Sequence, residues 1–311
     1  LQALCSNLLV AFPAKLLLNR RERYRLLPGV LRAVPSGKTN LLNPTITCWD
    51  RMPTWNLVFD IDFTLTGDLP SLRKLGQKLE RLQQADQARV LFCTGRPYPD
   101  VLHGLKHEEL PQPDAIIAQT GAELYLPPFG SFSTPILDWQ LQLEKFGFSV
   151  EEVHQRLIDL NDVISLEAAN CQTTHKVSYA IMDPKQPLAW LAEISRRMVE
   201  PVGRYQVICA AFGESYYVDI LPGMVNKGKA LRYLLELLKW QEANTIVAGD
   251  SGNDQSMFDE GFRGILVGNA RPEVKEYLQK FPAEQFYQAQ QNYAKGVLEG
   301  LAHWQVPTFD D

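Results

Sequence analysis

From Trp55 onward the sequence alternates short, continuously apolar segments with longer segments of helical periodicity. The strands predicted from these segments are 55–61, 89–93, 115–118, 245–248 and 264–267, and in the first of them the apolar run is 57–59. A strand that is apolar along its whole length is buried on both faces, as in a parallel sheet covered by helices on each side. The sequence therefore predicts an α/β fold with a Rossmann-like parallel-sheet core.

Two segments between these strands have the apolar stripe of a packed helix. Within segment 71–86 the stripe is Leu72, Leu75, Leu79 and Leu82, and a second stripe is Leu231, Leu234, Leu235 and Leu238. Residues three and four apart lie on the same helical face. Pro70 suits the first turn of the first helix, where its missing N–H costs nothing. Both stripes are therefore expected to pack on the sheet.

The middle of the chain has a different pattern. Segments 175–182, 205–211 and 214–221 read as longer strands, with a helix over 187–199 between them. A run of strands with its own helix indicates an α+β unit inserted into the parallel core. We therefore expect a catalytic core formed by residues 52–126 and 219–311, with a cap domain at 127–218.

Residues 1–51 differ from the rest in charge. They hold eight Lys/Arg and two acids, a net charge of +6, so the remaining residues carry −11 (−5 minus +6). The first methionine is Met52, just before the first predicted strand. We expect residues 1–51 to lie outside the fold, as a targeting stretch, as upstream sequence or as the remnant of a fusion.

Composition excludes several classes of function. A net charge of −5 argues against a nucleic-acid-binding protein, which needs a basic surface. The five cysteines are scattered without a C-x-x-C pair, which predicts reduced thiols in a cytoplasmic protein rather than a zinc site or disulfides. No apolar run reaches the roughly 20 residues of a membrane span, so no membrane association is expected.

Two acids stand where the first predicted strand ends. Acids are unfavourable in strands, yet Asp60 and Asp62 follow the apolar run directly, and Thr64 comes next. In an open parallel sheet the carboxyl ends of the strands form the ligand-binding edge. Alternation directs Asp60 and Asp62 to the same side. One carboxylate can attack phosphorus and the other can protonate the leaving oxygen.

Two further segments offer groups for a phosphate. The strand 89–93 is followed by Thr94, Gly95 and Arg96, whose hydroxyl and backbone N–H groups can hold phosphoryl oxygens. Lys227 stands in the segment 226–229 that opens the second predicted helix. A lysine at a helix N-terminus opposes the helix dipole, so neutralising a phosphate gives it a reason to be there.

The segment 248–254, Ala-Gly-Asp-Ser-Gly-Asn-Asp, follows another apolar strand. Asp250 and Asp254 at the two ends of this tight turn suit a hard cation with oxygen ligands. Magnesium would reduce the repulsion between the Asp60 carboxylate and a phosphate dianion. The sequence therefore predicts a magnesium-dependent phosphoryl-transfer site.

These four segments, in this order, resemble the haloacid-dehalogenase superfamily of phosphatases over about residues 55–304. Within it the chain is most similar to sucrose-6-phosphate phosphatases, through the stretches 176–179, 217–222, 226–228, 249–254, 268–270 and 298–304. The resemblance implies hydrolysis of sucrose 6-phosphate to sucrose and phosphate through an aspartyl-phosphate. It implies these catalytic residues: Asp60 as nucleophile, Asp62 as acid/base, and Thr94 and Lys227.

The resemblance also implies the ligand sets. Mg²⁺ would be held by Asp60, Asp62, Asp250 and Asp254. The phosphate and sugar would be bound by Thr94, Gly95, Arg96, Lys176, Lys227 and Asn253. Lys176 and Ser178 share one strand face, with Tyr179 on the other, and we expect Lys176 to point at the sugar.

Some positions depart from the pattern of the resembled group. Leu65-Thr66 follows Thr64 where that group has Trp, Pro97 stands where Ser is usual, and Ala122 replaces Ser or Thr. These changes keep other substrates open, namely the phosphate of another disaccharide or a glycoside. A phosphomutase remains conceivable, as does a non-catalytic domain associated with a sucrose-phosphate synthase-like glycosyltransferase.

Overall fold

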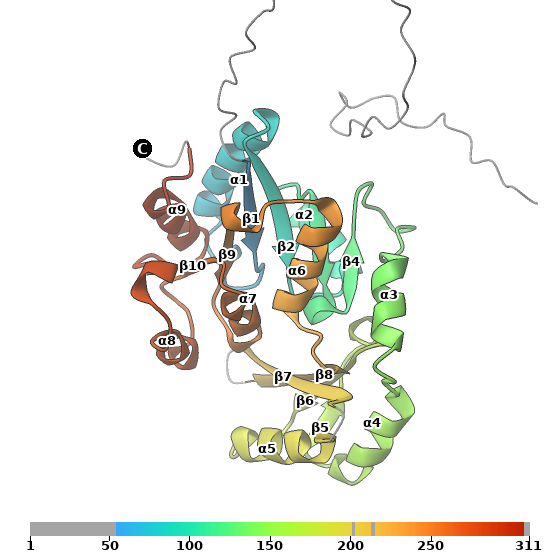
Figure 1. Ribbon diagram of the computed structural model, residues 1–311. Coiled ribbons are helices and arrows are strands. Elements are labelled where there is room, and N and C mark those ends of the chain that lie inside the picture. The colour runs from blue at the N-terminus through green and yellow to red at the C-terminus, as the bar shows by residue number, and fades with distance from the viewer. Residues whose placement is uncertain (1–53, 201–202, 213–214, 308–311) are drawn as a thin grey trace, which may run out of the picture. The chain divides into compact units, whose positions relative to one another are not determined.

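The computed structural model describes residues 54–200, 203–212 and 215–307 (Figure 1). The predicted extension at 1–51 lies outside the described residues. Among the helices of the described part, none combines the length and the apolar character that crossing a bilayer requires. Among the cysteines of the described residues, Cys93, Cys171 and Cys209 form no disulfide.

The larger of the two sheets in the described part of the chain has seven strands in the order β11-β10-β9-β1-β2-β3-β4. All neighbours are parallel except β3 and β4, which are antiparallel. The α/β prediction is therefore confirmed, with β4 as an antiparallel edge strand that the sequence did not reveal. The strands are β1 (Trp55–Phe59), β2 (Ala88–Cys93), β3 (Ala115–Ala118), β4 (Glu123–Tyr125), β9 (Thr245–Gly249), β10 (Arg263–Leu266) and β11 (Phe286–Gln288).

Helices cover both faces of this sheet. The step from β1 to β2 and the step from β9 to β10 run in opposite directions across it, so right-handed crossovers place their helices on opposite faces. Accordingly α1 packs with α9, and α6 packs with α7. These helices are α1 (Leu69–Gln84), α2 (Tyr98–His107), α6 (Lys227–Leu238), α7 (Gln255–Asp259), α8 (Pro272–Leu278) and α9 (Tyr293–His303).

The two predicted leucine stripes lie in the interior. All four leucines of the first stripe are buried in α1. In α6, Leu231, Leu234 and Leu235 are buried, whereas Leu238 is only partly covered. Each fully buried leucine contributes about 2 kcal/mol relative to an exposed one, so these stripes hold the helices on the sheet.

The second sheet is antiparallel, in the order β5-β6-β8-β7 (Figure 1). Its buried apolar side chains form a separate hydrophobic cluster. Helices α4 and α5 cover one of its faces through side chains such as Val153, Leu157 and Ile194. Here we call this unit the cap and the seven-stranded unit the core. The boundary predicted at residue 218 falls inside β8. The cap elements are α4 (Val150–Leu157), β5 (Ile164–Leu166), β6 (Val177–Ile181), α5 (Pro187–Met198), β7 (Tyr205–Phe212) and β8 (Ser215–Pro222). Helix α3 (Leu137–Glu144) falls within the range 127–218 predicted for the cap, but its buried residues Trp139 and Leu143 pack in the hydrophobic cluster of the core.

The register of the central strands decides which residues meet at the sheet edge. Phe59, the last residue of β1, is paired with Phe92 of β2 and with Ala248 of β9. The residues that follow these partners therefore emerge next to one another at the carboxyl ends of three adjacent strands. This places Asp60, Thr94 and Asp250 in one neighbourhood.

Candidate active site

Three carboxylates gather at this edge of the core. Asp60 follows β1, Asp250 follows β9, and Asp254 ends the short helix η5 (Gly252–Asp254). One oxygen of each lies within 4.8 Å of the others, and all three residues are buried. Thr64 donates from Oγ1 to Asp250 Oδ1 at 3.2 Å. Buried carboxylates repel one another strongly unless cations or protons neutralise them.

Lys227 supplies one positive charge to this cluster. It is the first residue of α6, and its side chain is fully buried. Its Nζ donates to Asp60 Oδ1 and to Asp254 Oδ1, both at 2.6 Å. Burial alone would lower the pKa of the Lys227 ammonium, but the adjacent Asp254 and Asp60 outweigh it, and the pKa is raised above its ordinary value. Lys227 is therefore a permanent cation.

One lysine does not neutralise three acids. Burial raises the pKa of Asp60 to about 7, although the attraction of Lys227 opposes this rise. Burial, together with the charges of Asp254 and Asp60, raises the pKa of Asp250 to about 9. A divalent cation favours the ionised form of both groups, and an all-oxygen donor set suits a hard ion such as Mg²⁺. The chemistry of this cluster thus fits magnesium.

Asp254 differs from the other two acids because both of its oxygens have partners within the protein. Oδ1 accepts from Lys227, and Oδ2 accepts from the backbone N–H groups of Asp250 and Ser251 at 3.0 Å. The approach is so close that a Cβ on Gly249 would lie 2.6 Å from the Asp254 side chain. Asp254 therefore holds the loop and the lysine in place.

Asp62 is held by an arginine rather than by a lysine. Arg96 donates from Nε to Asp62 Oδ2 at 2.9 Å and from Nη2 to Asp62 Oδ1 at 2.7 Å. Its remaining nitrogen, Nη1, lies 2.9 Å from Glu108 Oε2. Arg96 was predicted to bind substrate. It lines the pocket described below, but its charge is already engaged by two carboxylates.

Three predicted site residues lie beneath the pocket rather than on its surface: Thr94, Lys227 and Asp254 are not among the residues that line it in the described part of the chain. Thr94 is fully buried, and its Oγ1 accepts from the Arg96 N–H at 3.1 Å. Gly95, next to it, does line the pocket. The roles predicted for these residues remain predictions.

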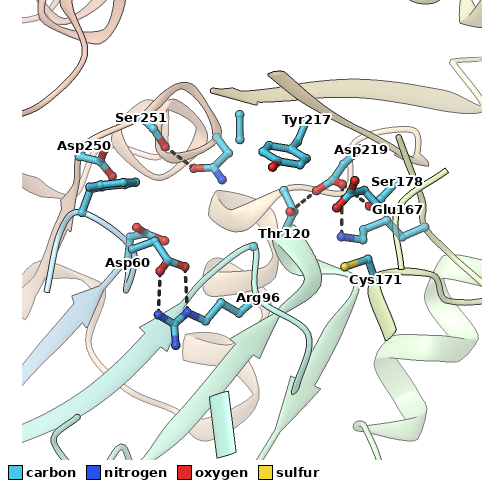
Figure 2. Close-up of a pocket in the computed structure, with 16 residues that line it drawn as sticks. Asp60, Arg96, Thr120, Glu167, Cys171, Ser178, Tyr217, Asp219, Asp250 and Ser251 are labelled. Atoms are coloured by element: carbon cyan, nitrogen blue, oxygen red, sulfur yellow. Dashed lines mark hydrogen bonds and ion pairs between the residues drawn. The ribbon is translucent and has the colours of Figure 1, made fainter. Parts of the chain in front are cut away.

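The pocket has a volume of about 200 Å³ and is lined by residues of both the core and the cap (Figure 2). Asp60, Asp250 and Ser251 lie on one side and Asp219, Ser178 and Glu167 on the other, with Thr120 and Tyr217 between them (Figure 2). The residues that line it are Asp60, Asp62, Phe63, Gly95, Arg96, Thr120, Glu167, Cys171, Lys176, Ser178, Ala210, Tyr217, Asp219, Asp250, Ser251 and Asn253.

The cap side of the pocket is polar and internally paired. Lys176, which is 2% exposed, lies 3.2 Å from Asp219 Oδ1, and Ser178 donates to the same oxygen. Ser178 is the register partner of Asp219 across β6 and β8. Tyr179 lies in the opposite, helix-covered face, where its hydroxyl contacts His154 Nδ1 at 2.6 Å. The predicted placement of Lys176 and Ser178 on one face and Tyr179 on the other is therefore confirmed, whereas contact of Lys176 with a sugar stays a prediction.

Thr120 joins the core to the cap and was not predicted. Its Oγ1 donates to Asp219 Oδ2 at 2.5 Å, and its φ of 59° is strained for a β-branched residue. The neighbouring Gln119 donates from Nε2 to the Asn170 carbonyl oxygen at 2.8 Å. The polar run directly after the strand 115–118 was the sequence signal that could have identified this turn.

Comparison with a family model gives a match over nearly all of the described chain. The model of the family described as sucrose-6F-phosphate phosphohydrolase matches residues 53–305. The sucrose-phosphatase of Synechocystis sp. PCC6803, solved in complex with sucrose and phosphate, superimposes with a TM-score of 0.73 at 28% identity. That comparison covers 83% of this chain and 100% of the cyanobacterial one.

Two relatives by sequence carry other names. The mannosylfructose-phosphate phosphatase of Agrobacterium fabrum is 28% identical over 246 residues, which are 79% of this chain and 94% of that protein. The glucosylglycerol-phosphate synthase of Pseudomonas anguilliseptica is 27% identical over 249 residues, 80% of this chain but 30% of the synthase. The similarity thus extends to proteins named for different sugar phosphates.

Proposed function

The chain belongs to the sucrose-6F-phosphate phosphohydrolase family, and from this premise we propose that it hydrolyses sucrose 6-phosphate to sucrose and phosphate, with Mg²⁺, through an aspartyl-phosphate. It is a haloacid-dehalogenase-type phosphatase, a phosphoric monoester hydrolase. The observation that supports the mechanism most is the contact of the buried Lys227 with Asp60 and Asp254 at the sheet edge. Asp60 lines the pocket together with another aspartate, Asp62.

Asp60 acts as the nucleophile in this proposal. It lines the pocket, and Lys227 holds one of its oxygens, which leaves the other free to attack phosphorus. The new bond joins that oxygen to phosphorus, while the bond to the sugar oxygen breaks. Water then attacks the aspartyl-phosphate, which releases phosphate and restores the Asp60 carboxylate. Lys227 offsets part of the negative charge in both steps.

Asp62 acts as the general acid and base. In the first step it gives a proton to the departing sugar oxygen, and in the second it accepts one from the attacking water. The same group thus serves both half-reactions and returns to its starting state. Its side chain lines the pocket near Asp60, at the same strand end, and Arg96 fixes its orientation.

Asp60 and Asp250 are the side chains proposed to hold Mg²⁺, with the backbone carbonyl oxygen of Asp62. Asp254 and Asn253 support them, since both oxygens of Asp254 are already engaged by protein donors. When bound, the ion would supply positive charge that reduces the repulsion between the Asp60 carboxylate and a phosphate dianion.

The titration of the acidic cluster gives a prediction about stability. The pKa of Asp60 is raised to about 7 and that of Asp250 to about 9, from an ordinary value of 3.8. At a pH above the ordinary value, the unfolded chain has released both protons, whereas the folded protein keeps each proton until the pH reaches the raised pKa of that group. The free energy of unfolding therefore falls as the pH rises through this range. In chelator, Tm should therefore fall between about pH 6 and about pH 9 through these two groups.

Magnesium should oppose this fall, because it favours the ionised carboxylates. We expect saturating Mg²⁺ to raise Tm more at about pH 9 than at about pH 6, where protons compete for the same oxygens. Asp250→Asn should reduce the difference, whereas Asp162→Asn, on an exposed position of the cap, should leave it unchanged. A Mg²⁺-induced shift of equal size at both pH values would contradict the proposed ligands.

The sugar is proposed to lie against the polar side of the cap. Glu167, Lys176 and Asp219 offer hydrogen bonds of both polarities, and Tyr217 offers a flat ring against which a sugar can stack. A site built to pair with hydroxyls discriminates against substrates that leave its buried polar groups unpaired. The cap would therefore set the substrate, while the core supplies the reaction.

We expect Lys176→Ala to reduce kcat/KM for the true sugar phosphate at least about tenfold, a loss of about 1.4 kcal/mol. An aryl phosphate that does not reach the cap should be nearly unaffected. Initial rates of phosphate release on both substrates measure the difference. Lys185→Ala, on an exposed position of the cap, is the matched control. Equal losses on the two substrates would show that Lys176 supports the fold or the phosphate instead.

Phosphate release from a panel of sugar phosphates tests the proposed function. The panel should include sucrose 6-phosphate, mannosylfructose phosphate and glucosylglycerol phosphate, each with Mg²⁺ and with excess chelator. We expect sucrose 6-phosphate to have the highest kcat/KM, and only with Mg²⁺. Preference for another member would reassign the substrate within the same mechanism. Full activity in chelator would remove Asp250 from the metal role.

A non-catalytic role is the second candidate, and one observation favours it. A glucosylglycerol-phosphate synthase contains a segment similar to this chain, which is compatible with association with a sucrose-phosphate synthase-like glycosyltransferase. The same panel separates the two candidates, since a docking domain would release no phosphate from any member.

A further inference from the structure

Arg96 lies between two carboxylates that face it from different elements. On one side it contacts both oxygens of Asp62, at 2.9 and 2.7 Å. On the other side Nη1 contacts Glu108, which caps the C-terminus of α2, at 2.9 and 3.1 Å. The three residues form a continuous chain of charged hydrogen bonds from the end of α2 to the acid/base aspartate.

The guanidinium is closely confined in this position. Its side chain is 15% exposed, against 37% for Asp62. A Cβ on Gly104 of α2 would lie 3.0 Å from Nη1, so the helix passes close beside the arginine. The backbone is also fixed, because the Arg96 N–H donates to Thr94 Oγ1 and its carbonyl oxygen accepts from Gln119, both at 3.1 Å.

Charge also favours this arrangement. Burial alone would lower the pKa of the Arg96 guanidinium, but the hydrogen bonds and charges of Asp62 and Glu108 outweigh it and raise the pKa further above its already high ordinary value. Arg96 thus stays charged under any condition in which the protein is folded. The planar guanidinium donates two parallel hydrogen bonds to the Asp62 carboxylate and leaves Nη1 for the Glu108 carboxylate.

We propose that Glu108 is a positioning residue that acts on the reaction through Arg96, by aiming the guanidinium that orients the Asp62 carboxylate. The inference rests on the acid/base role proposed for Asp62. Asp62 and Arg96 line the pocket, whereas Glu108 is absent from the lining residues of the described chain. Glu108 therefore reaches the substrate only through Arg96.

Orientation matters because proton transfer needs an oxygen within hydrogen-bond reach of the leaving group. A half-exposed aspartate samples several rotamers, and a bidentate arginine restricts it to one. Each carboxylate oxygen keeps a second lone pair for the proton or the water. Glu108 prevents Arg96 from turning away from Asp62. The Asp62 carboxylate is therefore oriented before the reaction begins, and no free energy is needed to orient it during proton transfer.

The adjacent residue Glu109 provides a matched control. Glu109 forms the same kind of bidentate pair, with Arg73 at 2.6 and 2.7 Å, but on the exposed surface and away from the pocket. We expect Glu108→Ala to lower kcat for sucrose 6-phosphate by about threefold, the effect of one charged partner. KM should change less than kcat. Glu109→Ala should alter neither constant, and Glu108→Gln, which keeps an acceptor, should recover part of the loss.

A double-mutant cycle shows whether Glu108 acts through Arg96. Arg96→Gln should lower kcat at least about tenfold, because a misplaced catalytic group is costly. In that background, Glu108→Ala should have no further effect. An equal threefold loss in both backgrounds would overturn the inference, as would a Glu108→Ala rate equal to that of Glu109→Ala. If Glu108→Ala does not fold, Glu108→Gln carries the same comparison.

Asp62→Asn, measured in parallel, separates this inference from the proposed function. If Asp62→Asn keeps the kcat of the unmodified protein, the acid/base assignment itself fails. If Asp62→Asn is inactive while Glu108→Ala matches Glu109→Ala, the positioning role fails and the proposed function stands.

Discussion

Replacing Asp60 with asparagine is expected to lower kcat for sucrose 6-phosphate below about one per cent of the unmodified value, because an amide cannot form the acyl phosphate and loss of a nucleophile costs several kcal/mol. Asparagine has the shape of aspartate and can still accept the hydrogen bond from Lys227. The loss should therefore appear in kcat, measured as phosphate released with saturating substrate and Mg²⁺.

We expect Asp60→Asn to lose activity without losing thermal stability. Burial raises the pKa of Asp60 to about 7, so its ionised form is less favoured at neutral pH than that of an ordinary aspartate. Asp60→Asn removes one carboxylate from a cluster of three around one lysine, so Tm in chelator should be equal to that of the unmodified protein or higher. Retention of more than about one per cent of kcat in a folded variant would contradict a covalent role for Asp60.

Replacing Lys227 with methionine should have the largest effect on stability. Lys227 is fully buried and neutralises Asp60 and Asp254 at 2.6 Å each. Removing one partner of a buried ion pair leaves the other uncompensated, which costs about 3–5 kcal/mol. The carboxylates can relieve part of this cost by taking up protons, so we expect a loss of about 2–3 kcal/mol in the free energy of unfolding near neutral pH.

Catalysis should be lost together with this stability, because the ammonium group that contacts Asp60 would no longer offset the charge on Asp60 and the phosphoryl group. Lys229→Met is the matched control. Lys229 stands on the same turn of α6, but it is 44% exposed and pairs with Glu260 at 2.9 Å. Denaturant unfolding and phosphate release should be measured for both variants. If both substitutions had equally small effects on the free energy of unfolding and on the rate of phosphate release, the proposal that Lys227 neutralises the acidic cluster would be contradicted.

The sequence was sufficient to predict the core and the meeting point of its acids. Continuously apolar strands lie inside a covered parallel sheet, and the carboxyl ends of such strands meet at one edge. From these two rules Asp60, Thr94 and Asp250 are expected near one another, and the register of β1 with β2 and β9 places them there. The buried contact of Lys227 follows only once α6 is known to begin against this edge.

Side-chain partnerships were harder to predict. Arg96 was expected at a phosphate, yet in the structure it pairs with Asp62 and Glu108. Periodicity gives the face on which a residue lies, but the ion pair of Arg96 with Asp62, across 34 sequence positions, depends on the pairing of β1 with β2. Glu108 and Glu109 are indistinguishable by sequence, since only the register of the helix end decides which of them meets Arg96 and which meets Arg73.

The cap residues show a similar limit. Alternation placed Lys176 and Ser178 on one face of the predicted strand 175–182, but their pairing with Asp219 required the register of β6 against β8. Thr120 could not be predicted to join the two units, because its left-handed backbone is imposed by tertiary contacts rather than by its own preference. The antiparallel β4 was missed because three residues carry too little pattern.

The most direct test of the central claim is to trap the covalent intermediate. The protein should be quenched while it is turning over sucrose 6-phosphate with Mg²⁺ and then treated with borohydride, which reduces an acyl phosphate to an alcohol. Mass spectrometry of the peptide that contains Asp60 should then show homoserine at position 60, only when substrate was present. Reduction at another residue, or an unmodified Asp60 in samples quenched during active phosphate release, would contradict the mechanism.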